Sequence, residues 1–331
     1  MDYKEFCEHV KNEIKGFLPP KYADYGAELH IVSKPNMGDQ VGLTFVPPVS
    51  GFPTPVVYLE PFYDAYLNKG MNMGRIMVQI GTTAADGIEK GKLAVGEMLG
   101  SIPDMADWNK VKDKVTVRVI GVSRNTDLLQ NVPCRLFGDI ALIYQVSATA
   151  QDDTLLTVRI TNALMDNYGI SEPQLYEAAM ENSQRMMKVT CRPMGEVIGD
   201  LMGSSMAEEA WEAPAKLYVL SNESLQFGAA ALFYPGVIEK IGKNIPEGFY
   251  ILPSSIHEVL ILPKNQGEKA MLETMVQEIN ATQVAPDEVL SDFVSEYDSR
   301  NRTMEWGKDP NLTLPEKLQE KPPMLPSEVI L

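Results

Sequence analysis

Residues 249–262 read Phe249-Tyr-Ile-Leu-Pro-Ser-Ser-Ile-His-Glu-Val-Leu-Ile-Leu262, two apolar runs on either side of a Pro-Ser-Ser turn. Proline and serine are typical of turns, and short apolar runs bounded by such residues are typical of strands. The stretch therefore predicts a β-hairpin with strands at 249–252 and 256–262.

The segments around this hairpin predict a small α+β domain. Residues 217–220 indicate a strand, and residues 227–245 indicate a helix kinked at Pro235-Gly236. Apolar residues spaced three and four apart over 272–279 indicate a second helix.

A last helix is predicted to begin at Pro286. Proline fits the first turn of a helix, and the carboxylates of Asp287 and Glu288 suit the positive end of the helix dipole. The order β-α-β-β-α-α favours a small antiparallel sheet with helices on one side. The buried face of the last helix would consist of Leu290, Phe293, Val294 and Tyr297.

The rest of the chain mixes helical and strand patterns, and residues 62–105 give no clear element despite some helical spacing. The predicted elements are a helix at 3–17, strands at 29–32, 41–46 and 56–59, a helix at 108–119 with Val111, Val115 and Val119 spaced four apart, a hairpin formed by 139–148 and 155–160, and a helix that begins at the Ser171 capping box.

These elements predict an α+β fold with mostly antiparallel sheets, packed helices and two sub-domains. We expect domains at residues 1–202 and 216–302, joined by a small, acidic connector at 203–215. Five prolines and a loss of periodicity predict an extended, proline-rich C-terminal tail over 303–331.

The composition limits the possible partners. The 331 residues carry a net charge of −16, and 44% are hydrophobic, as expected for a protein with a substantial core. A surface this acidic repels phosphate backbones and anionic lipid, which argues against nucleic-acid or membrane binding and favours a basic protein partner. Without a membrane-length apolar run, a signal sequence or a disulfide pattern, we expect a cytoplasmic protein.

The common cofactor motifs are incomplete. The segment from Gly236 to Asn244 has one residue too many for a phosphate-binding loop, and it has Asn where the hydroxyl that holds magnesium belongs. His9, His30 and His257 are far apart, and Ile261 stands where a zincin motif beginning at His257 requires its second histidine. We therefore expect no cofactor and no metal.

The candidate catalytic residues are Ser254, Ser255, His257 and Glu258. On a strand, Ser255 and His257 would share a face with Cα atoms about 6.5 Å apart, whereas catalysis requires hydrogen-bond reach between nucleophile and base. Glu258 would point to the opposite face. Two interpretations remain: a hydrolase site around residues 253–258, or a hairpin turn with two serines and a partly exposed histidine.

The candidate partner-binding residues are Glu288, Asp292 and Glu296. They are spaced four apart, so on the predicted last helix they would line one face. Residues 268–298 contain eight acidic residues, one lysine and no arginine. This face is either a surface for a basic partner or a solvated helix face.

Several stretches of the chain carry a resemblance to known sequences. They are Ile160-Thr-Asn-Ala-Leu-Met-Asp-Asn-Tyr-Gly-Ile170 and the residues following it to 182, Gly228-Ala-Ala-Ala-Leu-Phe-Tyr-Pro-Gly-Val-Ile-Glu-Lys240, residues 248–259, Ala281-Thr-Gln-Val-Ala-Pro-Asp-Glu-Val-Leu-Ser-Asp292, and near the start Tyr3-Lys-Glu-Phe-Cys7 and Val57-Tyr-Leu-Glu60. These stretches resemble a family of uncharacterised proteins from anaerobic gut Firmicutes. The resemblance covers residues 1–300 and implies cargo of mobile elements, with no activity, ligand or catalytic residue to carry over.

Two functional hypotheses follow. The first is a non-enzymatic accessory protein of a mobile element, which acts by contact through an acidic face. The second is a hydrolase with its site at the 253–258 hairpin. The first requires a surface that fits a basic partner, and the second requires His257 within hydrogen-bond reach of a nucleophile.

Overall fold

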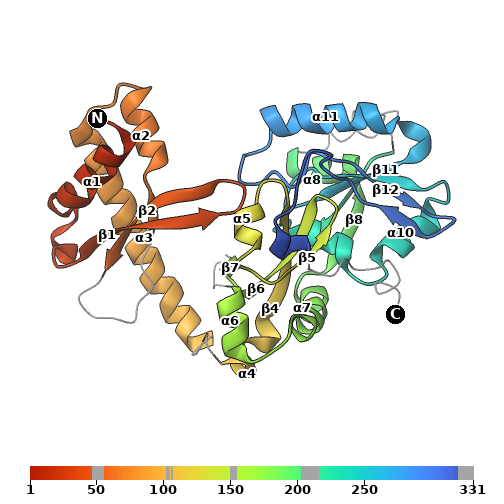
Figure 1. Cartoon of the computed structure of the whole chain (residues 1–331), viewed down its shortest axis with the longest axis horizontal. Coiled ribbons are helices and arrows are strands. Elements are labelled where there is room, and N and C mark those ends of the chain that lie inside the picture. Colours follow the sequence, from red (N-terminus) through yellow and green to blue (C-terminus); the bar gives the residue numbers. More distant parts are fainter. Residues whose placement is uncertain (47–55, 102–104, 106, 150–154, 203–215, 320–331) are drawn as a thin grey trace. The chain divides into compact units, whose positions relative to one another are not determined.

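The computed structural model describes residues 1–46, 56–101, 105, 107–149, 155–202 and 216–319. The chain divides into two compact units (Figure 1). Unit 1 consists of Met1–Asp104 and Ala148–Leu156, and unit 2 consists of Met105–Ser147 and Thr157–Leu331. The predicted connector at 203–215 lies outside the described residues.

Unit 1 combines helices with an antiparallel sheet ordered β1-β2-β3. Helix α1 is capped by Asp2, whose carboxylate accepts a hydrogen bond from the Glu5 amide at 2.8 Å. Phe6, Val10 and Ile14 are fully buried, which confirms the predicted amphipathic helix. The elements are α1 (Tyr3–Glu13), η1 (Ile14–Phe17), η2 (Pro20–Tyr22), β1 (Gly26–Lys34), β2 (Gly38–Val46), β3 (Val56–Tyr58), α2 (Glu60–Leu67) and α3 (Met73–Ser101).

Unit 2 contains two antiparallel sheets. In the first, β4 pairs with β6, and β6 also pairs with β5 and β7. The second has the order β13-β12-β10-β11-β9-β8. The strands are β4 (Val115–Gly121), β5 (Cys134–Phe137), β6 (Ile140–Thr149), β7 (Leu155–Arg159), β8 (Val189–Pro193), β9 (Tyr218–Asn222), β10 (Phe249–Leu252), β11 (Val259–Pro263), β12 (Ser295–Asp298) and β13 (Thr303–Glu305).

Helices and short 3₁₀ turns cover these sheets. Asn182 and Ser183 of α7 bond the backbone of β4, because Asn182 Nδ2 donates to Val115 O at 3.0 Å and Val117 N donates to Ser183 Oγ at 2.9 Å. The elements are α4 (Trp108–Val111), η3 (Lys112–Lys114), α5 (Thr126–Leu129), α6 (Asn162–Tyr168), α7 (Glu172–Met186), α8 (Met194–Met202), η4 (Gly228–Phe233), α10 (Val237–Asn244), η5 (Lys264–Gln266), α11 (Lys269–Thr282) and α12 (Glu316–Gln319).

The hairpin predicted at residues 249–262 is confirmed. Strands β10 and β11 pair antiparallel, with Phe249 opposite Pro263 and Leu252 opposite Leu260. Helix α11 runs along this sheet (Figure 1) and contributes Leu272 to a buried apolar cluster. The predicted α+β class with antiparallel sheets is therefore confirmed.

The predicted helix at 108–119 is wrong beyond its first turns. Residues Val115 to Gly121 form β4, which pairs with β6 along its whole length. The spacing of four that suggested a helix is also an even spacing, so it fits one face of a strand equally well. The β-branched residues of this segment favour the strand.

The predicted last helix is also wrong. Residues 286–294 contain no helix, and Ser295–Asp298 form strand β12 beside β10. Leu290 and Val294 are buried as predicted, but they enter the core from an irregular segment. A proline followed by two acids fits a helix start locally, and pairing with β10 overrides that preference.

The described part of the predicted tail is packed. Residues Thr303–Glu305 extend the six-stranded sheet as β13, and Leu318 of α12 is only 1% exposed. Trp306 stacks on Phe233 with ring centroids 5.3 Å apart. Scattered prolines therefore end regular structure here without preventing burial.

Two further predictions are modified. The predicted helix at 227–245 is two separate segments, η4 and α10, because Pro235 and Gly236, with φ of +77° at the glycine, interrupt it. The two sides of residues 203–215 share one sheet, because β8 pairs with β9. The compact units thus divide the chain differently from the predicted domains.

Candidate functional site

The loop between β10 and β11 brings the four candidate catalytic residues together, and its two serine hydroxyls bond to Glu258. The hydroxyls of Ser254 and Ser255 both donate to Glu258 Oε1, at 3.0 and 2.9 Å. The imidazole Nδ1 of His257 accepts a hydrogen bond from the amide of Phe227 at 3.2 Å. Within the described chain no serine hydroxyl reaches that imidazole, so the pair of nucleophile and base required for catalysis is not assembled.

The contacts of this loop instead fasten the hairpin to the segment after β9. Ser221 Oγ donates to His257 O at 2.8 Å, and the Phe227 ring stacks on the imidazole at 5.5 Å. A Cβ atom at Gly228 would lie 2.6 Å from His257 O, so only glycine allows the two segments to come this close. These polar residues therefore have a structural role in the described geometry.

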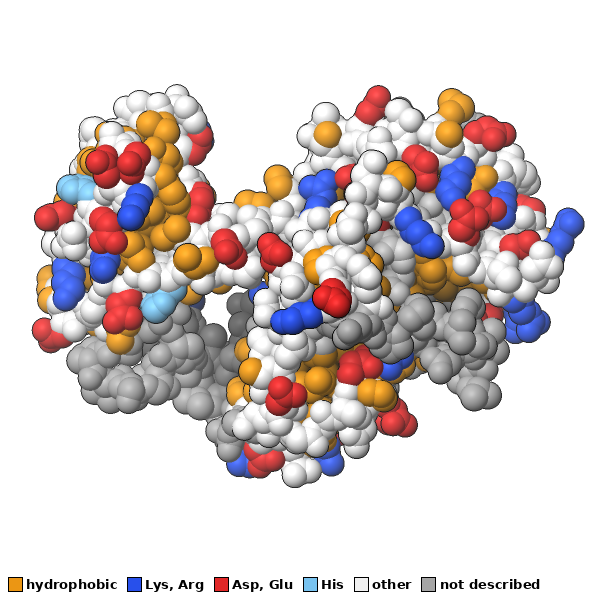
Figure 2. Space-filling model, in the orientation of Figure 1, with side chains coloured by type: hydrophobic (Ala, Val, Ile, Leu, Met, Phe, Trp, Pro, Cys, Tyr) orange, Lys and Arg blue, Asp and Glu red, His pale blue; other side chains and the backbone are white. Residues whose placement is uncertain are grey.

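The three candidate partner-binding carboxylates lie in separate environments. Glu288 Oε1 is 3.4 Å from His257 Nε2, Asp292 Oδ2 accepts from Arg124 at 3.0 Å, and Glu296 forms an ion pair with Lys264. Figure 2 likewise shows acidic side chains dispersed among basic ones over the visible face of unit 2. The predicted single acidic helix face does not form, because the helix itself does not form.

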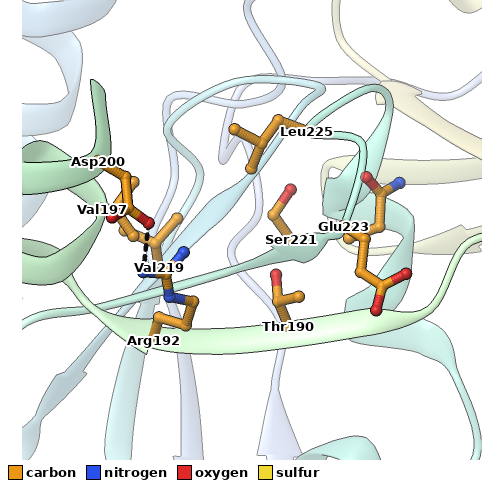
Figure 3. Close-up of a pocket in the computed structure, with 9 residues that line it drawn as sticks. Thr190, Arg192, Val197, Asp200, Val219, Ser221, Glu223 and Leu225 are labelled. Atoms are coloured by element: carbon orange, nitrogen blue, oxygen red, sulfur yellow. Dashed lines mark hydrogen bonds and ion pairs between the residues drawn. The ribbon is translucent and has the colours of Figure 1, made fainter. Parts of the chain in front are cut away.

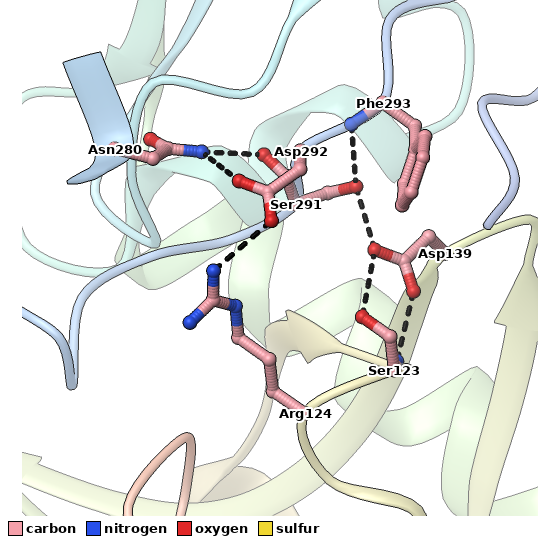
Figure 4. A network of polar contacts seen from close by, with 7 residues as sticks. All are labelled: Ser123, Arg124, Asp139, Asn280, Ser291, Asp292 and Phe293. Atoms are coloured by element: carbon pink, nitrogen blue, oxygen red, sulfur yellow. Dashed lines mark hydrogen bonds and ion pairs between the residues drawn. The ribbon is translucent and has the colours of Figure 1, made fainter. Parts of the chain in front are cut away.

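A buried carboxylate joins the two sheets of unit 2 (Figure 4). Asp139 is 1% exposed and accepts three hydrogen bonds: from Ser123 N at 2.8 Å, from Ser123 Oγ at 3.2 Å and from Ser291 Oγ at 2.8 Å. Burial raises the pKa of Asp139 above its usual range, and the hydrogen bonds from Ser123 and Ser291 act in the opposite direction. The three groups that donate to Asp139 all belong to the protein. Their hydrogen bonds hold separate segments of unit 2 together and so stabilise the fold.

Strand β8 is one edge of the six-stranded sheet. Glu223 N donates to Lys188 O, and Met194 N donates to Leu217 O, so every second residue from 188 to 194 is bonded to β9. The N–H and C=O groups of Val189 and Cys191 therefore point away from β9. Among the described residues these groups have no backbone partner.

A cavity of about 220 Å³ lies on one face of β8 (Figure 3). Thr190 and Arg192 of β8 line it, and Arg192 is paired with Asp200 of α8 at 2.6 Å. The carboxylate of Glu223 also lines this cavity, and it has no hydrogen-bond or ion-pair partner among the described residues. With Glu196 also 3.6 Å from Arg192, carboxylates outnumber cations here.

A second cavity, of about 430 Å³, lies on the opposite face of the strand. Val189 and Cys191 of β8 line it, as the alternation of side chains along a strand requires. Its other lining residues are mainly apolar, with Lys240 and Asn244 as the polar ones: Tyr218, Val237, Lys240, Ile241, Asn244 and Ile245.

The β8 edge was not predicted from the sequence. Its local signal is weak: Val189-Thr-Cys-Arg-Pro193 has strand-forming residues followed by a proline, which is tolerated at sheet edges. The two cavities depend on α8, β9 and α10, which are contributed by later residues. Neither cavity is visible in the linear spacing of motifs.

Cys191 provides a direct test of the geometry of this edge. It is exposed, whereas Cys7 and Cys134 are buried. We expect the native protein to react rapidly with about one equivalent of a thiol reagent such as Ellman's reagent, and an unfolded sample to react with all three thiols. The Cys191→Ala variant should lose the rapid phase, and a rapid phase that persists in this variant would contradict the assigned exposure.

In the part of the chain that the structure describes, no group of three or more His, Cys, Asp or Glu side chains is placed to hold a metal ion. The described helices also include none that is both long enough and apolar enough to cross a bilayer.

Comparison with known proteins identifies a family but no activity. No curated protein and no solved structure matches the chain. The model of a family of unknown function, DUF5688, matches residues 3–299, which include unit 1 and most of unit 2. The chain therefore belongs to this family of unknown function, DUF5688.

Proposed function

We propose that the protein is an accessory factor that acts by contact, and that its β8 edge binds an extended segment of a basic partner protein. The observation that carries the proposal is a strand edge that no other described strand pairs with, and that has a cavity on each face. Such a role also suits cargo of a mobile element.

Backbone pairing would supply much of the affinity. The outward N–H and C=O groups of Val189 and Cys191 present the pattern that a further strand completes. Addition of an extended peptide to a sheet edge is a general mode of recognition, in which pockets for alternate side chains provide specificity. Val189 is 41% exposed, so a bound strand would also cover apolar surface.

The two cavities define the partner segment. Ile241 and Ile245 favour apolar side chains on one face of the bound strand. Glu223 and Asp200 favour lysine or arginine side chains on the other face. The fitting occupant is therefore an extended segment in which apolar and basic residues alternate.

The other edge of the same sheet, strand β13, is less suited to the addition of a further strand. Strand β13 has three residues, and Glu305 is already paired with Lys269 at 3.0 Å. Short and charged edges discourage strand addition, so the two edges of the described sheet differ in the way the proposal requires.

Selection from a phage-displayed library of random decapeptides tests the proposal. We expect enriched peptides to alternate apolar and basic residues. The Cys191→Pro variant removes one outward N–H while leaving the bonds to β9, and it should weaken binding of a synthetic selected peptide about tenfold, as expected for one lost hydrogen bond. The Cys191→Ala variant is the matched control and should retain binding.

A second pair of variants tests the charge preference. Glu223→Lys should weaken binding of a basic peptide, whereas the same change at exposed Glu247, away from the lining of both cavities, should not. Failure to enrich any peptide would refute the proposal, as would selected peptides that bind Cys191→Pro and Glu223→Lys as well as they bind the wild type.

A further inference from the structure

Arg118 is a partly buried cation that forms no ion pair among the described residues. It lies on β4, its Nε atom is buried without a hydrogen-bond partner, and its guanidinium carbon lies 4.1 Å from the centre of the Phe227 ring. Burial lowers the pKa of Arg118 to about 10; the nearby charge of Arg159 acts in the same direction, and that of Asp287 acts against both.

The surroundings of Arg118 are polar for a sheet interior. On the same face of the sheet, Thr116 is opposite Gln145, and Thr116 Oγ1 lies 2.6 Å from Ser147 Oγ. These three side chains are at most 3% exposed. A strip of buried polar groups thus continues from the guanidinium along the strands.

An unpaired guanidinium is costly to bury, and an apolar residue of similar volume would usually be at least as stable at such a position. A favourable reason to keep the cation is an anionic ligand, since a guanidinium binds carboxylate and phosphate oxygens through parallel N–H donors.

We infer that Arg118, with its guanidinium stacked on the ring of Phe227, binds the oxyanion group of a small ligand in unit 2. The group that it would bind is a phosphate or a carboxylate, because both present oxyanions to the guanidinium. This site is separate from the β8 edge in the residues it uses, so neither assignment depends on the other.

Thermal unfolding in inorganic phosphate and in acetate, each compared with chloride at matched ionic strength, tests the assignment. We expect a saturable increase in Tm with at least one of the two oxyanions, because a ligand that binds only the folded state stabilises it. The arm that gives the larger shift identifies the preferred group. No saturable shift with either anion, carried into the tens of millimolar, would overturn the inference.

The Arg118→Met variant separates a ligand-binding role from a structural one. It should abolish the anion-dependent shift while its Tm without ligand stays at or above that of the wild type. Arg300→Met, at an exposed arginine, is the matched control and should keep the shift. An unchanged shift in Arg118→Met, or a strong loss of its ligand-free stability, would overturn the inference.

Discussion

Replacement of Asp139 by alanine should lower the free energy of unfolding by about 3 kcal/mol. The change removes the acceptor of three hydrogen bonds and leaves the Ser123 amide and the Ser291 hydroxyl without their partner. Each buried group left unsatisfied costs about 1–3 kcal/mol. Because the residue also links the two sheets of unit 2, chemical denaturation should show the loss as a lower midpoint for that unit.

The same variant has a defined pH signature. The folded state raises the pKa of Asp139, so it binds more protons than the unfolded state once the pH exceeds the unfolded pKa of about 4. Wild-type stability therefore decreases as pH rises through this window, and the variant lacks this contribution. The difference in stability between wild type and Asp139→Ala should accordingly be larger at the acidic end of the window than at neutral pH.

Exposed Asp166 in the same unit provides the control, and its replacement by alanine should change stability by less than about 0.5 kcal/mol. An Asp139→Ala protein as stable as the wild type would show that the network in Figure 4 contributes nothing to the fold. A stability difference that grows with rising pH would contradict the assigned direction of the pKa shift.

The sequence predicted correctly those elements whose contacts lie within one short stretch of chain. The hairpin at residues 249–262 carries its turn and both strands in one stretch, and its predicted strands pair as β10 and β11. Helix α11 likewise has its apolar face within a few turns, with Leu272 and Val276 buried. Both predictions needed no information from distant residues.

The predictions failed where pairing with a distant strand decides the conformation. Residues 115–121 become a strand because β6 lies beside them, and residues 295–298 become a strand because β10 does. Neither partner can be recognised from spacing within the segment itself. Acidic residues predicted to share a helix face were separated for the same reason.

The two proposed sites combine residues that are even farther apart in the sequence. The β8 edge is formed by pairing across residues 203–215, and its cavities need helices from both sides of that segment. Arg118 did leave a trace in the sequence, as a single charge within Val115-Thr-Val-Arg-Val-Ile120. A charged residue in an apolar strand is an informative signal, but the lack of a hydrogen-bond partner at its Nε atom in the described structure is visible only in three dimensions.

The second large effect is expected at Leu318, because the sequence and the structure disagree most clearly there. An extended tail would tolerate any substitution, whereas α12 places Leu318 in a cluster with Ile120, Leu129 and Ile143. Leu318→Ala should lower the free energy of unfolding by about 3 kcal/mol, the usual cost of emptying a buried leucine site. Urea denaturation measures it.

Lys317, the exposed neighbour, separates burial from a general intolerance of α12 to change. Lys317→Ala should alter stability by less than about 0.5 kcal/mol, since its side chain lies outside the apolar cluster. Equal effects at the two positions would mean that α12 contributes through its helical backbone. If neither Leu318→Ala nor Lys317→Ala changes stability, the prediction of an extended tail would stand. Other residues would then have to cover the apolar cluster around Ile120.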